Sequence, residues 1–222
     1  MSFILQRPFL LVFVSAILIL FSLPPFSISI FYWFGLSLFF FCLITKTVLT
    51  KRSIFLFFFI IQFISLSWII QSFYSGGFFY LILGIILIFS LASFISFLNF
   101  SIVIFIFKIF KSSDLKYFLL PLSLSVIELL KEFLLGGFPW NPVAIIYYKN
   151  IWVLKSLPIV GVYGLGIIIH LILGFYLYTI IKQRKIFSYV IVLMVSLLFL
   201  FSFFDKETLE NINDETLDIV LI

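Results

Sequence analysis

The sequence predicts an all-α polytopic membrane protein with about seven transmembrane helices. Of its 222 residues, 64% are hydrophobic and only 10% are charged, and the mean hydropathy is +1.35. An ordinary soluble domain carries about 25% charged residues, so this chain has too few charges to cover a protein that folds in water. Apolar runs long enough to cross a bilayer recur along the chain, and short basic clusters separate them. A soluble enzyme and an extracellular disulfide scaffold are therefore excluded.

The predicted spans follow from a bilayer core that takes about 17–25 helical residues. The first span ends at Pro24-Pro25, which cannot continue a helix, so it forms a tight hairpin with the second. A cleavable signal peptide over residues 1–23 is the alternative, but only Arg7 precedes the apolar run and no small-x-small cleavage site follows. The seven predicted spans are residues 8–23, 28–45, 54–74, 78–107, 117–135, 158–181 and 186–204.

The fourth span is about 45 Å long as a single helix, against a hydrocarbon core of about 30 Å. A break near Asn99 into two short helices is the alternative. A break would invert every later loop and place six basic residues outside, so one long helix is favoured.

The basic residues predict the orientation. Ten of the fourteen fall on one side of the predicted bundle, which is the cytoplasmic side by the positive-inside rule. The amino terminus is then inside and the tail after Phe204 is outside. This dispersal among loops also argues against nucleic acid as a partner, despite a net charge of +5. The ten are Arg7, Lys46, Lys51, Arg52, Lys108, Lys111, Lys116, Lys182, Arg184 and Lys185.

The tail divides the chain into three predicted segments. Residues 1–204 form the transmembrane domain, and residues 205–215 form a polar linker. Residues 216–222 are apolar and β-branched, which is typical of a buried strand of a parallel sheet. A strand needs neighbours for its backbone groups, so we expect a soluble domain to begin here.

Few residues are candidates for chemistry. Cys42 and His170 are the only cysteine and histidine, which excludes an intramolecular disulfide and a multi-cysteine metal site, and argues against a Ser-His-Asp triad. We expect no cofactor and no metal. Cys42 lies among apolar residues, where a thiol is a poor nucleophile. We expect His170 to be a hydrogen-bonded interior residue, and the glycines of Gly161-Val162-Tyr163-Gly164-Leu165-Gly166 to allow close helix packing.

The fifth span carries the most informative charges. Glu128, Lys131 and Glu132 share one helix face, so Lys131 can bridge two carboxylates. Ionisable groups are costly in a membrane helix and usually face a partner or a cavity. Two interpretations stay open: a structural ion pair that orients the helix, and a polar face that lines a lipid or substrate cavity.

Two glycine pairs adjoin aromatic segments on the predicted outer side. Gly136-Gly137 precedes Phe138, Pro139 and Trp140, and Gly76-Gly77 follows Trp68. The aromatic residues fit an interfacial belt, or a pocket that holds an acyl chain or a lipid headgroup. Two such glycine-hinged loops on the same side are suited to frame one outward-facing site.

These residues resemble a known family. The run Glu-x-x-Lys-x-x-x-x-Gly-Gly-Phe-Pro-Trp from Glu128, followed by Gly-Val-Tyr-Gly from Gly161, is similar to the membrane domain of bacterial apolipoprotein N-acyltransferase. Leu23-Pro24-Pro25-Phe26 and Trp68 fall in the family's order. The resemblance implies transfer of an acyl chain from a membrane phospholipid to the N-terminal cysteine amine of a diacylated lipoprotein, at the periplasmic face of the bacterial inner membrane. Residues 216–222 then resemble the first strand of the family's nitrilase-like α/β domain.

The chain differs from the family beyond that strand. The family's catalytic Glu, Lys and Cys belong to the nitrilase-like domain, so the resemblance assigns no catalytic residue here, and Cys42, Glu128 and Lys131 do not take those roles. Lys131 also stands where the family usually has arginine. We expect a truncated membrane half that is inactive alone.

Within that half, Phe138, Pro139, Trp140 and Trp68 are expected to shape the substrate mouth, and Glu128 and Lys131 to hold the loop. A non-catalytic polytopic scaffold or a small permease-like protein is the alternative.

Overall fold

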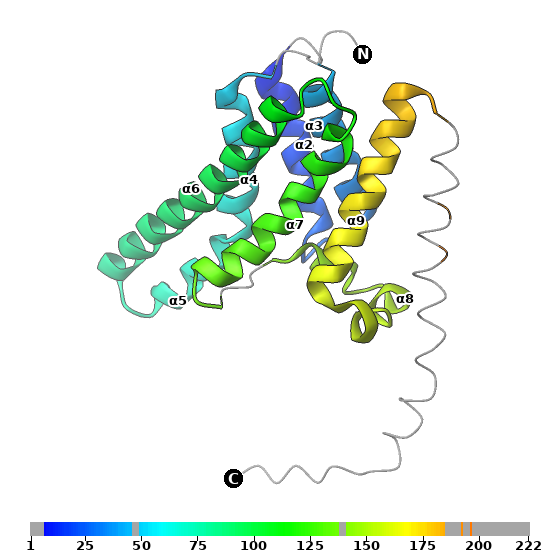
Figure 1. The fold of residues 1–222 in the computed structure, drawn as a ribbon. Coiled ribbons are helices and arrows are strands. Elements are labelled where there is room, and N and C mark those ends of the chain that lie inside the picture. The colour runs from blue at the N-terminus through cyan, green and yellow to red at the C-terminus, as the bar shows by residue number, and fades with distance from the viewer. Residues whose placement is uncertain (1–6, 46–48, 138–140, 185–191, 193–195, 197–222) are drawn as a thin grey trace, which may run out of the picture.

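The described part of the chain folds into a bundle of helices (Figure 1). The computed structural model describes residues 7–45, 49–137, 141–184, 192 and 196. Shorter helices connect the long ones near one end: η1 (Ser67–Ile70), α5 (Gln71–Tyr74), η2 (Val143–Tyr147) and α8 (Ile151–Leu154). The longer helices are α2 (Pro8–Ser22), α3 (Ile30–Ile44), α4 (Lys51–Ser65), α6 (Phe78–Ile109), α7 (Lys116–Leu134) and α9 (Leu157–Lys182).

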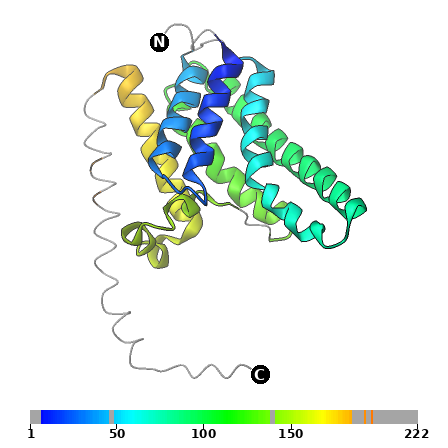
Figure 2. The same ribbon diagram turned by 180° about the vertical axis from the view of Figure 1, so that it is seen from behind.

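The helices pack in a definite order of neighbours. α2 lies against α3 and α4, α4 against α6, α6 against α7, and α7 against α9, which also touches α3. Figure 2 shows α2 between α3 and α4. The core contains Phe39 of α3 stacked on Phe57 of α4, with ring centroids 3.7 Å apart and both side chains fully buried. Gly35 lets α3 approach α2 closely, because a Cβ there would lie 2.7 Å from the Ser15 carbonyl oxygen.

Span length separates the described helices into classes. α6 and α9 are long and apolar enough to cross a membrane, and α4 with the bent segment after it is a third candidate. α2 and α3 have 15 residues each, about 22 Å of helix, which is shorter than a hydrocarbon core of about 30 Å. By length and composition, two or three spans are supported among the described residues, and the predicted seven are not confirmed. The predicted span 186–204 lies almost wholly outside them, and the linker 205–215 and the strand 216–222 lie outside them entirely.

α6 is one helix, as the basic residues predicted. It runs without interruption through Asn99, whose side-chain Nδ2 donates to the carbonyl oxygen of Ile95 over 2.8 Å. The amide is thus accommodated inside a regular helix, and the alternative of a break at this residue is wrong.

The predicted single run over residues 54–74 ends where α5 ends, but it differs from the structure at its start and in its middle. α4 begins earlier, at Lys51, because Thr50 caps it: the Thr50 Oγ1 accepts from the Ser53 backbone N–H, and the Thr50 N–H donates to the Ser53 Oγ. After Ser65 the chain bends by 44° into η1 and α5. No proline or glycine marks this bend in the sequence.

The close helix packing predicted for three glycines of α9 holds for one of them. Gly161 has φ +70° and interrupts the regular helix, and a Cβ on it would meet nothing within 4 Å. A Cβ on Gly164 would meet only Val160, at an ordinary 3.5 Å. Close packing holds for Gly166, where a Cβ would lie 3.1 Å from both the Glu128 Oε2 and a Val143 methyl carbon.

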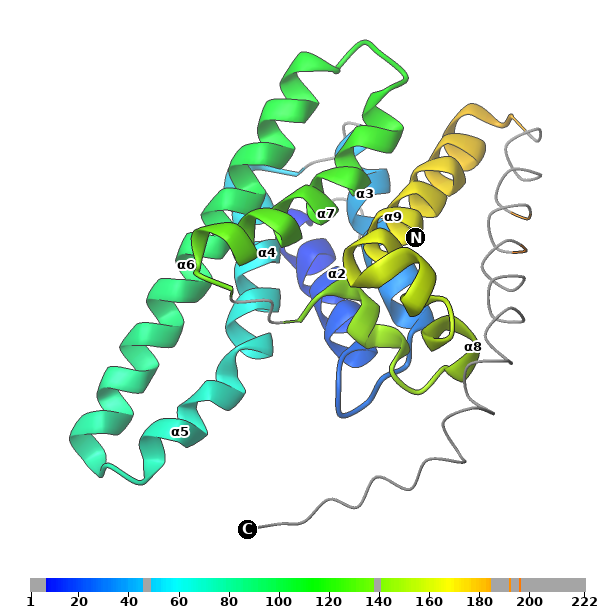
Figure 3. The ribbon, with the colours of Figure 1, turned by 60° about the horizontal axis from the view of Figure 1, so that its bottom comes forward.

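The two ends of the bundle differ in charge and shape. The lower end in Figure 1 holds the α2–α3 turn, η1, α5, η2 and α8; Figure 3 shows α5 and α8 on opposite sides of it. Among described residues, only Lys149 and Lys155 bring basic charge to the lower-end loops. The basic residues of the upper end are Arg7, Lys51, Arg52, Lys108, Lys111, Lys116, Lys182 and Arg184.

At the upper end an ion pair joins the α6–α7 turn to α9. The Lys182 Nζ lies 2.8 Å from the Asp114 Oδ1, and the Tyr178 hydroxyl donates to the Asp114 Oδ2 over 3.3 Å. The hydrogen bond from Lys182 holds the pKa of the Asp114 carboxyl below its ordinary value. The contact fixes the turn against α9.

Candidate functional site

The lower end contains a large groove. Its volume is about 830 Å³, and most of its lining is apolar. The Trp68 side chain, 43% exposed, forms part of one wall. The lining comes from three segments: Leu20, Leu23, Pro24, Pro25 and Phe26 around the α2–α3 turn; Ile64, Ser65, Ser67, Trp68, Ile70 and Gln71 from α4 to α5; and Asn141, Pro142 and Ile145 after α7.

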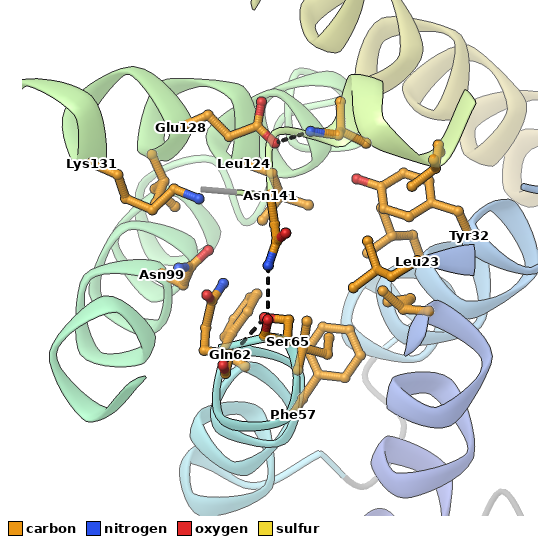
Figure 4. Close-up of a pocket in the computed structure, with 17 residues that line it drawn as sticks. Leu23, Tyr32, Phe57, Gln62, Ser65, Asn99, Leu124, Glu128, Lys131 and Asn141 are labelled. Carbon is orange, nitrogen blue, oxygen red and sulfur yellow. Dashed lines mark hydrogen bonds between the residues drawn. The ribbon is translucent and has the colours of Figure 1, made fainter. Parts of the chain in front are cut away.

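A smaller cavity, with several polar residues in its lining, lies deeper in the bundle next to the groove (Figure 4). Its volume is about 90 Å³, which is room for a few water molecules at about 30 Å³ each but not for a lipid chain. Apolar side chains of α2, α3 and α4 close one side of it. The polar residues around it are Gln62, Ser65, Asn99, Glu128, Lys131 and Asn141, with Tyr32 opposite.

Asn141 separates the two hollows. Its side-chain Nδ2 donates to the backbone carbonyl oxygen of Ser65 over 3.1 Å, and both residues line the groove and the cavity. The backbone of Asn141 is left-handed, with φ +54°, a conformation that asparagine tolerates better than most residues. One side-chain hydrogen bond thus joins α4 to the segment after α7 at the boundary between groove and cavity.

Glu128 fixes the start of η2. Its Oε1 accepts from the Val143 backbone N–H over 2.8 Å. Its Oε2 is buried beside Gly166 of α9 and has no hydrogen-bond partner among the described residues. A carboxylate inside the bundle therefore anchors the loop that follows α7.

Lys131 lies one turn further along the same face of α7 and is only 7% exposed. In Figure 4 its ammonium group points toward the cavity, and it interacts electrostatically with Glu128. Burying either charge alone would be costly, so each stabilises the ionised form of the other. The polar face predicted for this helix therefore borders a cavity.

His170 joins three helices below the surface. Its Nε2 lies 2.8 Å from the Tyr32 hydroxyl of α3, and its Nδ1 lies 2.6 Å from the Ser125 hydroxyl of α7. The side chain of His170 is fully buried. A neutral imidazole satisfies both contacts, since it donates through one nitrogen and accepts through the other. The prediction of a hydrogen-bonded interior histidine is confirmed.

A second bridge holds η2 against α3. The Trp33 Nε1 donates to the Tyr147 hydroxyl over 2.7 Å. Burial raises the pKa of Tyr147 to about 12, so the hydroxyl stays protonated at physiological pH. With Glu128 at its start and Tyr147 at its end, η2 is fixed at both ends.

The structure describes only some of the other predicted site residues. Phe138, Pro139 and Trp140 lie outside the described residues. Gly136 and Gly137 follow α7, with φ +62° and +86°, and Gly77 precedes α6 with φ +84°. These glycines make the turns at the helix ends, while Gly76 packs against the Tyr80 ring. Glu132 is half-buried on α7.

The amide side chains of the cavity were not predicted from the sequence. Gln62 and Asn99 are isolated polar residues in apolar helices, and Asn141 directly follows the predicted aromatic segment. An uncharged amide inside a predicted span is a signal for a polar cavity, because hydrocarbon offers it no hydrogen-bond partner.

The comparisons with known proteins agree with this architecture. No match is found among curated proteins. A family model described as the apolipoprotein N-acyltransferase N-terminal domain matches residues 15–175, which include the second half of α2, the residues that line the groove and the cavity, and most of α9. The chain belongs to the apolipoprotein N-acyltransferase N-terminal domain family.

Proposed function

We propose that the chain is the membrane domain of an acyltransferase that moves a fatty acyl chain from a phospholipid to the N-terminal cysteine amine of a diacylated lipoprotein. Its groove binds an acyl chain of the lipid substrate. The observation that carries this proposal is the groove itself, because it is large and mainly apolar and has a few hydrogen-bonding groups in its lining. No residue of this chain is given a catalytic role.

The dimensions of the groove suit this ligand. Small-molecule sites commonly measure about 300–1,000 Å³ and combine an apolar lining with a few polar groups. The groove has this character, with Ser65, Ser67, Gln71 and Asn141 as its polar side chains. An ester or headgroup can hydrogen-bond there while the hydrocarbon chain contacts Trp68, Ile70 and Ile145.

The distribution of charge supports an orientation. Basic residues gather at the upper end, which faces the cytoplasm under the positive-inside rule. The groove then opens on the periplasmic side of a bacterial inner membrane, with the amino terminus in the cytoplasm and the tail in the periplasm. This is the side on which the family acts on lipoproteins.

We further propose that Phe138, Pro139 and Trp140 extend the mouth of the groove. They directly precede Asn141, which lines it. Support for the loop comes from the hydrogen bond between Glu128 and the Val143 N–H, and from the charge of Lys131 beside Glu128.

The experiment replaces a side chain that lines the groove with a larger one. In Ile145→Trp, the larger ring occupies groove volume, and we expect at least about tenfold weaker phospholipid binding to the purified chain in detergent, followed by native mass spectrometry. The control is Val126→Trp, at a half-exposed residue in a separate apolar hollow beside α7. Unchanged binding in Ile145→Trp contradicts the proposal and favours a scaffold without a lipid site.

A further inference from the structure

A second apolar hollow lies on the other side of Phe26 from the groove. It is a crevice of about 420 Å³ between α2 and the start of α3, and its lining is apolar. Phe13, Val14, Ile17 and Leu18 of α2 form one wall, and Phe31 of α3 contributes to the other. Since the lining side chains include no hydrogen-bonding group, only hydrocarbon matches it.

Among the described residues, Phe26 alone lines both the groove and the crevice. Its ring packs edge-on against Phe21, with centroids 4.8 Å apart, and remains 56% exposed. The two aromatic rings thus form a short wall at the lower end. The two hollows meet at this wall, so two chains joined at one headgroup can enter them from the same side.

The crevice also has the direction of a lipid chain. From Phe13 to Phe21 it follows α2 for about 12 Å, at 1.5 Å of rise per residue. α2 runs from the upper to the lower end of the bundle (Figure 1). A chain in the crevice therefore lies along the helix axis, with its free end toward the middle of the bundle and its linked end at Phe26.

We propose that the crevice is a second acyl-chain site, and that a lipid with two chains straddles Phe26, one chain in the groove and one in the crevice. This inference rests on the proposed lipid-binding function of the groove. It makes Phe26 a specificity-determining residue, since the wall separates the chains of one lipid. A single-chain lipid of the same headgroup fills the groove alone.

The experiment compares two lipids that differ only in chain number. Diacyl phosphatidylcholine and lysophosphatidylcholine of equal chain length are titrated onto the purified chain in detergent, and the bound lipid is counted by native mass spectrometry. We expect the wild-type chain to prefer the diacyl lipid by at least about tenfold, because the second chain is buried.

Variants then assign the preference to a hollow. Ile17→Trp and, independently, Val14→Trp fill the crevice; each is expected to abolish the preference and leave lysophosphatidylcholine binding unchanged. Ile145→Trp is expected to weaken the binding of both lipids, and Val126→Trp is expected to change the binding of neither. Thermal melts confirm that the variants fold.

The failures are distinguishable. The proposed second site is wrong if both crevice variants keep the preference for the diacyl lipid, or if they weaken the binding of the two lipids equally. Neither result contradicts lipid binding in the groove. If Ile145→Trp changes the binding of neither lipid, the proposed function itself is wrong.

Discussion

The side-chain amide of Asn141 donates to the backbone carbonyl oxygen of Ser65, and this 3.1 Å hydrogen bond crosses the boundary between an apolar groove and a polar cavity. It connects the bend after α4 to the loop after α7, two segments that are 76 residues apart. Asn141 has a left-handed backbone and lines both hollows, so its backbone conformation and its side-chain hydrogen bond can be tested separately.

Substitutions of Asn141 separate its side chain from its backbone. Asn141→Gly loses the hydrogen bond, at about 1 kcal/mol, but keeps the left-handed backbone without strain. Asn141→Ala loses the bond and adds about 1–2 kcal/mol of strain at φ +54°. In detergent, the melting temperature is expected to be highest for the wild type, lower for Asn141→Gly and lowest for Asn141→Ala. Equal melting points for the two variants would show that the backbone strain is relieved elsewhere.

Glu128 and Lys131 are expected to be energetically coupled. Glu128→Gln keeps a carbonyl oxygen for the Val143 N–H, so the free energy of unfolding falls least. Glu128→Leu leaves that N–H without its acceptor and removes the carboxylate that interacts with the buried Lys131 charge, at about 3–5 kcal/mol. Adding Lys131→Met to Glu128→Leu restores most of the loss. A double-mutant cycle by chemical denaturation measures the coupling, and additive losses rule it out.

His170 is expected to stabilise the contact of α3 with α7 and α9. Tyr32→Phe and Ser125→Ala each leave one ring nitrogen without its partner, at about 1–3 kcal/mol. His170→Leu costs more than either, because it leaves both hydroxyls buried. Tyr176→Phe is the control, since Tyr176 is 40% exposed on α9. Melting temperatures rank the four variants, and a neutral Tyr32→Phe would contradict the bridge.

Two glycines of α9 give a matched pair for helix packing. A Cβ on Gly174 would lie 3.0 Å from the Phe118 Cα and from the Tyr117 carbonyl oxygen, which are backbone atoms of α7. Gly174→Ala is therefore expected to destabilise the bundle by about 1–3 kcal/mol. Gly164→Ala meets only a side-chain carbon at 3.5 Å and is expected to be neutral or slightly stabilising. Equal effects on the melting temperature would show that α7 shifts freely.

Cysteine labelling tests the orientation. In a Cys42→Ala background, Ser75→Cys places an exposed thiol at the lower end and Ser112→Cys places one at the upper end. A membrane-impermeant maleimide applied to spheroplasts is expected to label Ser75→Cys, and Ser112→Cys only after the membrane is opened. The reversed pattern would put the groove on the cytoplasmic side and remove the proposed orientation.

Local patterns predicted the parts of the fold that depend on local physics. Pro24-Pro25 ends the first helix, and the charges on either side of α6 favour one helix through Asn99. The bend after Ser65 was missed because no helix breaker marks it. The amide side chains of the cavity were missed because Gln62 and Asn99 line it together with Lys131 only through the packing of α4, α6 and α7, which no local pattern encodes.

The contacts between α7 and α9 restrict how the lower end can move. Asp114 and Lys182 tie the upper end of the pair, Ser125 and His170 tie its middle, and Glu128 lies against Gly166 and holds the Val143 N–H below. The two helices are therefore joined at three levels along their length. At the lower end of α4 the chain bends by 44°, and the Asn141 side chain donates one hydrogen bond to the carbonyl oxygen of Ser65 there. The boundary between groove and cavity is therefore held on the α7 side by these contacts, and on the α4 side by the Asn141 hydrogen bond and by the packing of α4 against α2 and α6.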